Sequence, residues 1–391
     1  MARDFTASHV KALPKSGIRK FFDIVAQMKD VVSLGVGEPD FDTPWHVSRA
    51  AVTCLEDGGT HYTSNLGTPE LRQAICRYLD RRFSAKYSWK NETLVTVGVS
   101  EAIDLAIRAV TEPGDEIIYH EPCFVSYAPV IRLAHGLPVC VETTAAESFK
   151  LTVKALEKKV TPKTKALLLN FPCNPTGAVL SAAEMRAIAR FVLKHDILLL
   201  ADEVYSELVY DSKPMSFSSM PELKDNLVLL NGFSKSWAMT GFRLGYACGA
   251  APIIDSMMKI HQYGLMSAPT LSQAAGAEAM DRGDGDVERM RSEYKRRRDF
   301  FVEALNRSGL KTAMPKGAFY LFADIRSTGL QAEEFCLKLL EEYSVACVPG
   351  TAFGAGGEGF VRMSYATSME KLRTAAERIE LFVRKLKKHV V

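Results

Sequence analysis

The stretch "LVLLNGFSKSWAMTGFRLGY" (residues 227–246) starts as an apolar run typical of a buried strand and continues into a loop rich in small and polar residues. It carries Lys235, with Ser234 before it, and then Arg243 in the pattern G-x-R-x-G. In open α/β sheets, ligands bind at the carboxyl ends of the strands, so a lysine here need not be a solvated loop residue. The stretch raises the hypothesis that Lys235 anchors a ligand whose charge Arg243 holds.

Other apolar runs also lead directly into polar side chains. The runs and the residues that follow are "TLVTVGVSE" (93–101) with Val99 and Ser100, "ALLLNFPCNPTG" (166–177) with Asn170 and Asn174, and "ILLLADEVY" (197–205) with Asp202, Glu203 and Tyr205. Each alone has an ordinary explanation, because Asp and Ser frequently cap the next helix. Together they predict an anion site, an amide, a carboxylate and a phenol beside Lys235 at one rim of one sheet.

Amphipathic helical segments separate these runs. Apolar residues recur with helical spacing in 100–110, and "AAEMRAIARFVLKH" (182–195) is a second such segment. Uninterrupted apolar strands with helices between them indicate an α/β fold with a mostly parallel, mixed sheet between helices. We expect this large cofactor-binding domain to span residues 46–285.

The C-terminal part of the chain has a different pattern. A long charged helical segment (286–305) is followed by short strand-like runs near 318–323, 345–348 and 360–364. We expect residues 286–391, together with the turn-rich segment 1–45, to form a smaller α+β domain. The basic run "KRRR" (295–298) has acidic neighbours and is interpreted as a solvated helix face.

Composition excludes several classes of protein. With 391 residues, 47% of them hydrophobic and 24% charged, the chain is typical of a globular enzyme of two domains. A net charge of +3 gives no reason to expect nucleic acid or an anionic membrane as a partner. No run approaches the about 20 apolar residues that a membrane helix needs, and the N-terminus lacks a secretory signal. The eight cysteines form no C-x-x-C pair, so we expect no metal site and a reducing cytoplasm.

The polar groups expected at the rim match the parts of pyridoxal 5'-phosphate. Its aldehyde forms a Schiff base with a lysine, and a carboxylate keeps its ring nitrogen protonated so that the ring can accept electrons. Phenol and amide donors suit its ring oxygen. Helix N-terminal amides, a serine hydroxyl and an arginine suit its phosphate.

Six motifs make the chain resemble the class I aminotransferases of pyridoxal-phosphate fold type I. The motifs are "SLGVGEPDFDTP" (33–44), "HYTSNLGTPELRQAI" (61–75), "NFPCNPTGAVL" (170–180), "ADEVYSELVY" (201–210), "NGFSKSWAMTGFRLGY" (231–246) and "VRMSYATS" (361–368). They occur in family order from about residue 17 to 385, and the lysine motif is the most specific. The likeness is greatest to the branch that contains prokaryotic aspartate, aromatic amino acid and N-acetyl-diaminopimelate aminotransferases.

The resemblance implies roles around the cofactor. Lys235 is implied as the Schiff-base lysine and the group that moves a proton, with Asp202 on the pyridine nitrogen. The residues implied to contact the rest of the cofactor are Tyr205 and Asn174 at the ring oxygen, Phe124 of "EPCFVSY" (121–127) on the ring face, and Ser234, Arg243, Val99 and Ser100 at the phosphate. Tyr62 is implied to reach the phosphate of a neighbouring subunit, which means a homodimer with shared active sites.

The resemblance also implies residues that bind the substrate. Arg362 in "VRMSYA" (361–366) is expected to clamp the α-carboxylate, a task that suits a bidentate guanidinium. Gly37 is expected to add a backbone contact from a segment that closes over the substrate, and Asn174 and Phe124 also face it. The implied reaction moves an amino group between an L-amino acid and 2-oxoglutarate by a ping-pong mechanism.

The side chain that the substrate carries is less well determined. Some aspartate-specific relatives have "VGGK" where this chain reads "VGVS" (97–100), so that Ser100 replaces a lysine that binds the distal carboxylate. We therefore expect broad specificity that favours aromatic amino acids, with aspartate or N-acetyl-LL-diaminopimelate as alternatives. A carbon–sulfur β-lyase would use the same residues. A transcription regulator of this fold is a further alternative, but the motifs begin too early to leave room for a DNA-binding lobe before them.

Overall fold

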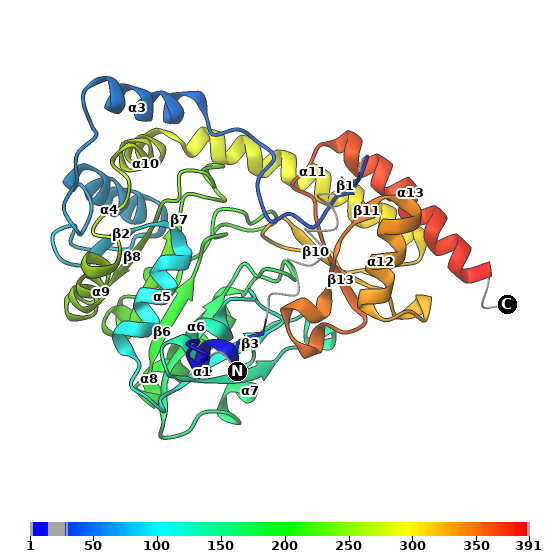
Figure 1. Cartoon of the computed structure of the whole chain (residues 1–391), viewed down its shortest axis with the longest axis horizontal. Coiled ribbons are helices and arrows are strands. Elements are labelled where there is room, and N and C mark those ends of the chain that lie inside the picture. The colour runs from blue at the N-terminus through cyan, green and yellow to red at the C-terminus, as the bar shows by residue number, and fades with distance from the viewer. Residues whose placement is uncertain (1–2, 15–27, 29, 389–391) are drawn as a thin grey trace.

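The central element of the fold is a seven-stranded mixed sheet (Figure 1). The computed structural model describes residues 3–14, 28 and 30–388. In spatial order its strands are β2 (Thr93–Thr96), β8 (Gly245–Gly249), β7 (Leu227–Gly232), β6 (Leu198–Asp202), β5 (Thr164–Asn170), β3 (Glu116–Glu121) and β4 (Leu137–Glu142). β8 runs antiparallel to both of its neighbours, whereas the other adjacent pairs are parallel. The expected mostly parallel mixed sheet is confirmed.

Strand β5 shows why the sheet is covered on both faces. Leu167 and Leu169 belong to one buried cluster, whereas Ala166 and Leu168 belong to another, because successive side chains of a strand point to opposite faces. One cluster includes side chains of α5 (Gly98–Val110), α6 (Tyr127–Leu133) and α9 (Ala251–Gly264), and the other those of α7 (Val153–Glu157) and α8 (Ala182–His195). Apolar runs without polar interruptions are therefore needed in these strands.

Helix α8 begins and ends at the residues that the sequence indicates. Ser181 accepts a hydrogen bond from the Glu184 backbone, and the Glu184 carboxylate accepts one from the Ser181 backbone, which completes a capping box. Further helices of this lobe are α3 (Trp45–Glu56), α4 (Pro69–Phe83) and α10 (Thr270–Arg282). The short helix α1 (Ser8–Lys11) contacts α6.

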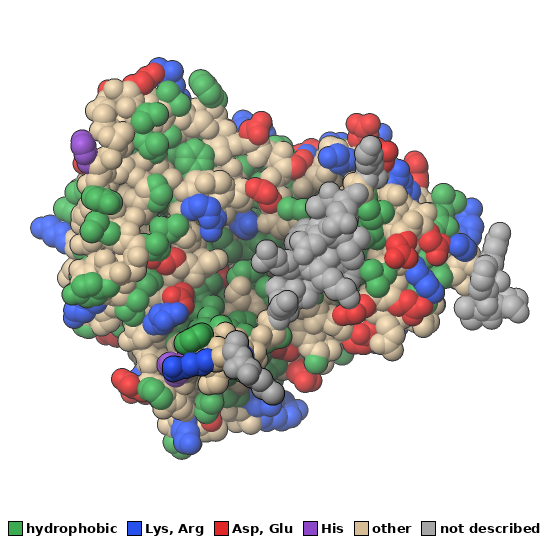
Figure 2. Space-filling view, viewed as in Figure 1, with side chains coloured by type: hydrophobic (Ala, Val, Ile, Leu, Met, Phe, Trp, Pro, Cys, Tyr) green, Lys and Arg blue, Asp and Glu red, His purple; other side chains and the backbone are tan. Residues whose placement is uncertain are grey.

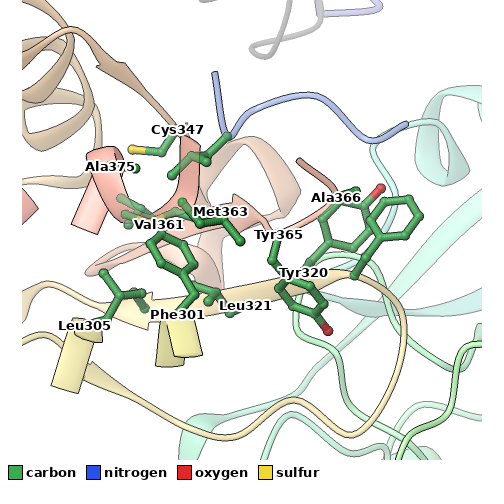
Figure 3. Packing of buried hydrophobic residues seen from close by; sticks show 14 of the residues in the cluster. Phe301, Leu305, Tyr320, Leu321, Cys347, Val361, Met363, Tyr365, Ala366 and Ala375 are labelled. Atoms are coloured by element: carbon green, nitrogen blue, oxygen red, sulfur yellow. The ribbon is translucent and has the colours of Figure 1, made fainter. Parts of the chain in front are cut away.

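A second, smaller lobe contains a four-stranded antiparallel sheet. Its strands are, in spatial order, β12 (Val348–Pro349), β13 (Phe360–Ser364), β10 (Tyr320–Asp324) and β9 (Lys311–Thr312). Helices α11 (Asp284–Ser308), α12 (Ala332–Tyr343) and α13 (Met369–Lys388) accompany it. Their apolar side chains share one buried cluster with the strands, part of which, including Phe301, Val361 and Met363, is seen in Figure 3.

The N-terminal segment contributes a strand to this smaller lobe. β1 (Val32–Ser33) pairs in parallel with β11 (Val345–Ala346). Residues 15–27 and 29 lie outside the described residues, and the exact domain limits at 45–46 and 285–286 stay a prediction. Short 3-10 helices complete the chain: η1 (Ala145–Glu147), η2 (Phe217–Ser219), η3 (Pro221–Asn226), η4 (Arg326–Thr328), η5 (Gly350–Phe353) and η6 (Ala355–Gly357).

The structure corrects the interpretation of the basic run at 295–298. Lys295 and Arg296 are solvated, but Arg297 and Arg298 are buried on the inner side of α11. Arg297 pairs with Asp40, at 2.7 Å, and Arg298 pairs with Asp211, at 2.9 Å. The expectation of a solvated face was wrong because a charge run does not reveal that carboxylates far away in the sequence lie opposite two of its members.

None of the described helices is both long and apolar enough to cross a bilayer. On the face seen in Figure 2, basic and acidic side chains are interspersed over the smaller lobe.

Candidate active site

A cavity of about 300 Å³ lies at the carboxyl ends of the parallel strands, against the smaller lobe. Every expected site residue except Tyr62 lines it, namely Gly37, Val99, Ser100, Phe124, Asn174, Asp202, Tyr205, Ser234, Lys235, Arg243 and Arg362. Strand β6 ends with Asp202, and the loops that follow β5, β6 and β7 supply Asn174, Tyr205, Ser234, Lys235 and Arg243. Parallel strands bring their carboxyl ends to one edge, which explains why residues so distant in sequence meet here.

Asp202 ends β6 and is a buried carboxylate to which two groups of the described residues donate hydrogen bonds. Its Oδ2 accepts from the hydroxyl of Tyr127, at 2.7 Å, and its Oδ1 from the backbone N–H of Val204, at 3.2 Å. Burial raises the pKa of the Asp202 carboxyl to about 6, and these two donors oppose the rise. A positively charged nitrogen placed in the cavity beside Asp202 would restore the charged form.

Lys235 follows β7 and reaches into the same cavity. Its ammonium donates a hydrogen bond to the carbonyl oxygen of Gly37, at 2.7 Å. Burial lowers the pKa of Lys235 to about 8, a nearby Glu38 opposes this, and Arg243 adds to it. A lysine with a depressed pKa is partly neutral near pH 7 and can act as a nucleophile.

Arg362 projects from β13 into the cavity and is almost wholly buried. Its Nη1 donates to Oδ1 of Asn174, at 3.0 Å, and its Nη2 donates to the carbonyl oxygen of Gly35. The guanidinium lies over the Tyr320 ring, 4.5 Å from its centre, and over the Phe353 ring, at 4.8 Å. Its Nε has no partner among the described residues, so a buried donor remains available for a ligand.

An anion site forms where α5 begins. Gly98 has a φ of +77°, and a Cβ there would come within 2.9 Å of Nη2 of Arg243, so this turn needs glycine. Val99, Ser100 and Ser234 line the same cavity as Arg243. Backbone N–H groups at a helix N-terminus and an arginine together favour a phosphate.

Two tyrosines of the site were missed by the sequence analysis. Tyr127 starts α6 and hydrogen-bonds Asp202, and Tyr320 starts β10 and hydrogen-bonds Tyr205. The only sequence signal for Tyr127 is that its segment follows β3, which ends at the same edge as β5 and β6. Tyr320 comes from the other lobe, and no local pattern indicates it.

Tyr62 lies away from the cavity, and 83% of it is exposed. Among the residues that the structure describes, no contact connects Tyr62 with the cavity. The role implied for Tyr62 at a neighbouring subunit stays a prediction.

The residues present fit pyridoxal 5'-phosphate. A cradle of glycine, helix N-terminus and arginine suits the phosphate, and the buried carboxyl of Asp202 suits a protonated ring nitrogen. Lys235 lies in the same cavity, and the spare Nε of Arg362 suits a substrate carboxylate.

Comparisons with known proteins agree with this geometry. The family model described as aminotransferase class I and II matches residues 29–379. The chain is 50% identical to the Bacillus subtilis protein YugH, named as an aminotransferase, over 97% of this chain and 99% of that one. It is 46% identical to an aspartate aminotransferase of Pyrococcus abyssi, over 95% and 96% of the two chains.

A solved structure gives the same result. The aromatic aminotransferase of Pyrococcus horikoshii OT3 superposes with a TM-score of 0.90 at 43% identity, over 95% of this chain and 99% of that one. The chain therefore belongs to the class I and II aminotransferases, enzymes that use pyridoxal 5'-phosphate.

Proposed function

We propose that this aminotransferase moves the amino group of L-amino acids, aromatic ones in preference, to 2-oxoglutarate by a ping-pong mechanism. The observation that carries the aromatic preference is the charge of the cavity wall. Of the described lining residues, Lys235, Arg243 and Arg362 are the cations, and each has a task at the cofactor or the α-carboxylate. Apart from Asp202, which is assigned to the ring nitrogen of the cofactor, the other described lining residues are neutral and include Ile103 and Phe124, which suits an apolar side chain.

The residues of this chain divide the chemistry among them. Bound pyridoxal phosphate supplies an electron sink and a carrier for the amino group. We assign the proton transfer at the substrate Cα to Nζ of Lys235, because it is the amine in the cavity whose pKa burial brings to about 8. Asp202 holds a proton on the ring nitrogen, and Arg362 orients the α-carboxylate.

The acceptor, 2-oxoglutarate, carries a second carboxylate, and we expect neutral groups of the cavity wall to bind it. Ser100 stands in the place of the lysine of some aspartate-specific relatives, and a hydroxyl makes a weaker bond to a carboxylate than an ammonium does. We therefore expect 2-oxoglutarate to bind more weakly than the oxo acid of an aromatic amino acid. Aspartate remains the alternative donor, since a relative named for it is 46% identical.

The first experiment mixes the cofactor-loaded enzyme with Glu, Asp, Phe, Tyr and N-acetyl-LL-diaminopimelate in turn, without an oxo acid. Conversion of the bound cofactor to its amine form is followed by absorbance in a stopped-flow instrument. We expect faster conversion with Phe and Tyr than with Asp. Rapid conversion by Asp with none by Phe or Tyr would refute the preference, and pyruvate and ammonia release from cystathionine would indicate a β-lyase instead.

A matched variant tests the role of Ser100. Ser100→Lys adds the missing cation at an exposed position of the cavity rim, so kcat/KM for Asp is expected to rise about 10- to 100-fold, the range of a charge-assisted hydrogen bond. The value for Phe should change little. If kcat/KM for Asp stays constant in the variant, the distal carboxylate does not reach this position.

We further propose a homodimer in which Tyr62 completes the partner's site. An exposed apolar surface supports it, which we call the Tyr62 surface: Tyr62, Tyr263, Leu265 and Met266. Tyr263 lies in the last turn of α9, and the loop after this helix is joined to the loop of Tyr62 by hydrogen bonds from Asn65 to the Met266 carbonyl, at 2.8 Å, and from Thr270 to the His61 carbonyl, at 2.7 Å. Large apolar side chains gathered on a fixed surface are typical of an interface.

A further inference from the structure

Tyr320 occupies a position between the two lobes that its sequence context does not reveal. It is 1% exposed, it is the first residue of β10, and its side chain lines the active-site cavity. In the β10–β13 register Tyr320 faces Ser364, whereas Phe322 faces Arg362. Tyr320 and Arg362 are thus diagonal neighbours on the same face of the sheet, within reach of one another.

The ring of Tyr320 supports the arginine expected to bind the substrate. The guanidinium carbon of Arg362 lies 4.5 Å from the ring centre, within the range of a cation–π interaction. Both residues are buried, so water does not compete for the ring face. Nη1 and Nη2 are held by Asn174 and Gly35, and the ring fixes the plane in which those bonds are made.

The hydroxyl of Tyr320 has a different partner. It lies 2.9 Å from the hydroxyl of Tyr205, the residue expected to donate to the cofactor's ring oxygen. A tyrosine has one proton to donate. If Tyr205 gives its proton to the cofactor, the bond between the two tyrosines must run from Tyr320 to Tyr205, and donation to Tyr205 makes it a stronger donor in turn.

We propose that Tyr320 is a positioning residue for this reaction: its ring holds the guanidinium of Arg362 in place for the substrate carboxylate, and its hydroxyl directs the proton of Tyr205 toward the cofactor. The two functions belong to different parts of one side chain and can be separated by substitution. This inference rests on the proposed roles of Arg362 and Tyr205.

The space beside Gly37 is a second observation that fixes the position of the Tyr320 hydroxyl. A Cβ on Gly37 would lie 2.5 Å from that oxygen, and the next nearest atom, the ring carbon that bears it, would be 3.5 Å away. The glycine thus makes room for this hydroxyl. A methyl group there would displace the ring, whereas the same methyl beside a phenylalanine would make an ordinary contact.

The test compares Tyr320→Phe, Tyr320→Leu and the control Tyr365→Phe, all loaded with cofactor. Tyr365 is also buried and bonds the Ala318 carbonyl, at 3.1 Å, but it lies outside the cavity lining. Binding of 3-phenylpropionate, a carboxylate without an amino group, is measured by calorimetry. The pH titration of the bound cofactor's absorbance reports on the ring oxygen and its donors, independently of turnover.

We expect Tyr320→Phe to keep 3-phenylpropionate affinity within about twofold, to raise the pH midpoint of the cofactor's absorbance and to lower kcat about tenfold with little change in KM. Tyr320→Leu should weaken 3-phenylpropionate binding by about 3- to 30-fold, the range of a cation–π contact. Tyr365→Phe should change neither. An unchanged midpoint in Tyr320→Phe, or an unchanged affinity in Tyr320→Leu, would overturn the inference.

A double variant keeps the test independent of any folding defect in Tyr320→Leu. Gly37→Ala should weaken 3-phenylpropionate binding, and Gly37→Ala combined with Tyr320→Phe should bind as well as Tyr320→Phe alone. Absence of that rescue would show that Tyr320 is not held against Gly37. If the unsubstituted enzyme failed to bind the carboxylate at all, the proposed role of Arg362 itself would be wrong, and the inference would fall with it.

Discussion

At the scale of single residues, Asp202 combines burial with a charge that the reaction needs. Burial raises the pKa of its carboxyl from 3.8 to about 6. Between these values the cofactor-free native protein binds more protons than the unfolded chain, so its stability falls as pH rises through this window. The shift corresponds to at most about 3 kcal/mol at pH 7. A buried charge of this kind destabilises the empty site and stabilises a bound cation.

Asp202→Asn is therefore expected to stabilise the cofactor-free protein. Above pH 6 the variant should gain up to about 3 kcal/mol in the free energy of unfolding, and between pH 4 and 6 its stability should depend less on pH. Urea denaturation at pH 4.5 and 7.5 measures both effects. The exposed Asp225→Asn is the control and should change neither. Turnover by Asp202→Asn should fall strongly, and a variant that is destabilised at pH 7.5 would contradict the argument.

Lys235→Ala tests the residue expected to act as the nucleophile and the proton carrier. The variant should remain folded and hold the cofactor without a covalent link, but turnover should fall by more than about 1,000-fold, because both the nucleophile and the proton carrier are lost. The control is Lys259→Ala, at an exposed lysine whose side chain pairs with Asp255 one turn away. Circular dichroism and activity measured on the same samples separate loss of chemistry from loss of fold. Wild-type turnover by Lys235→Ala would exclude the assignment.

At the scale of elements, α11 ties distant parts of the chain together through its buried arginines. Arg298 is 2% exposed, pairs with Asp211 and Asp299, and donates to the Pro315 carbonyl at 3.0 Å. Arg298→Ala should cost about 1.5–3 kcal/mol of unfolding free energy, since it removes the hydrogen bonds of a buried guanidinium to Asp211 and to the Pro315 carbonyl. Arg296→Ala, two residues earlier, removes an exposed pair and should cost less than about 1 kcal/mol. Equal losses in chemical denaturation would contradict the distinction between the two sides of the helix.

The same pair gives a dependence on pH. Arg298 holds the pKa of the Asp211 carboxyl well below its usual range. The stability from this pair is present above the ordinary pKa of an aspartate and is lost as pH falls below it. The cost of Arg298→Ala should therefore shrink in acid. A cost that is the same at pH 3 and pH 7 would mean that Asp211 does not carry the effect.

The elements also show where sequence reasoning succeeds and where it stops. The apolar runs before Asp202, Asn174 and Lys235 predicted both the sheet and the rim, because strand burial and the position of strand ends follow from local pattern. Helix α8 was located to the residue since its capping signal is local. The contacts of Arg298 with Asp211 and of Tyr320 with Tyr205 could not be predicted, because the residues of each pair lie far apart in the sequence.

At the scale of the whole molecule, the N-terminal segment joins the smaller lobe to the active site. Ser364 donates its backbone N–H to the Leu34 carbonyl, at 2.7 Å, and Arg362 donates to the Gly35 carbonyl. Two residues further, the Gly37 carbonyl accepts from Lys235, which belongs to the larger lobe. A short segment therefore contacts both the residue expected to bind the carboxylate and the residue expected to move the proton. A shift of one lobe against the other would be felt at both sites together.

The proposed sharing of active sites between subunits makes a quantitative prediction for mixed dimers. Lys235→Ala and Tyr62→Ala should each be nearly inactive as homodimers, because one lacks the amine and the other a contact to the cofactor phosphate. When the two variants are unfolded, mixed in equal amounts and refolded, half of the dimers are mixed, and each mixed dimer has one site with both native residues. Activity should recover to about a quarter of the wild-type value. Tyr263→Ala, a control elsewhere on the Tyr62 surface, is mixed with Lys235→Ala in the same way. That mixture should show no activity beyond the average of its two components. If the mixture is no more active than its components, Tyr62 does not act across subunits.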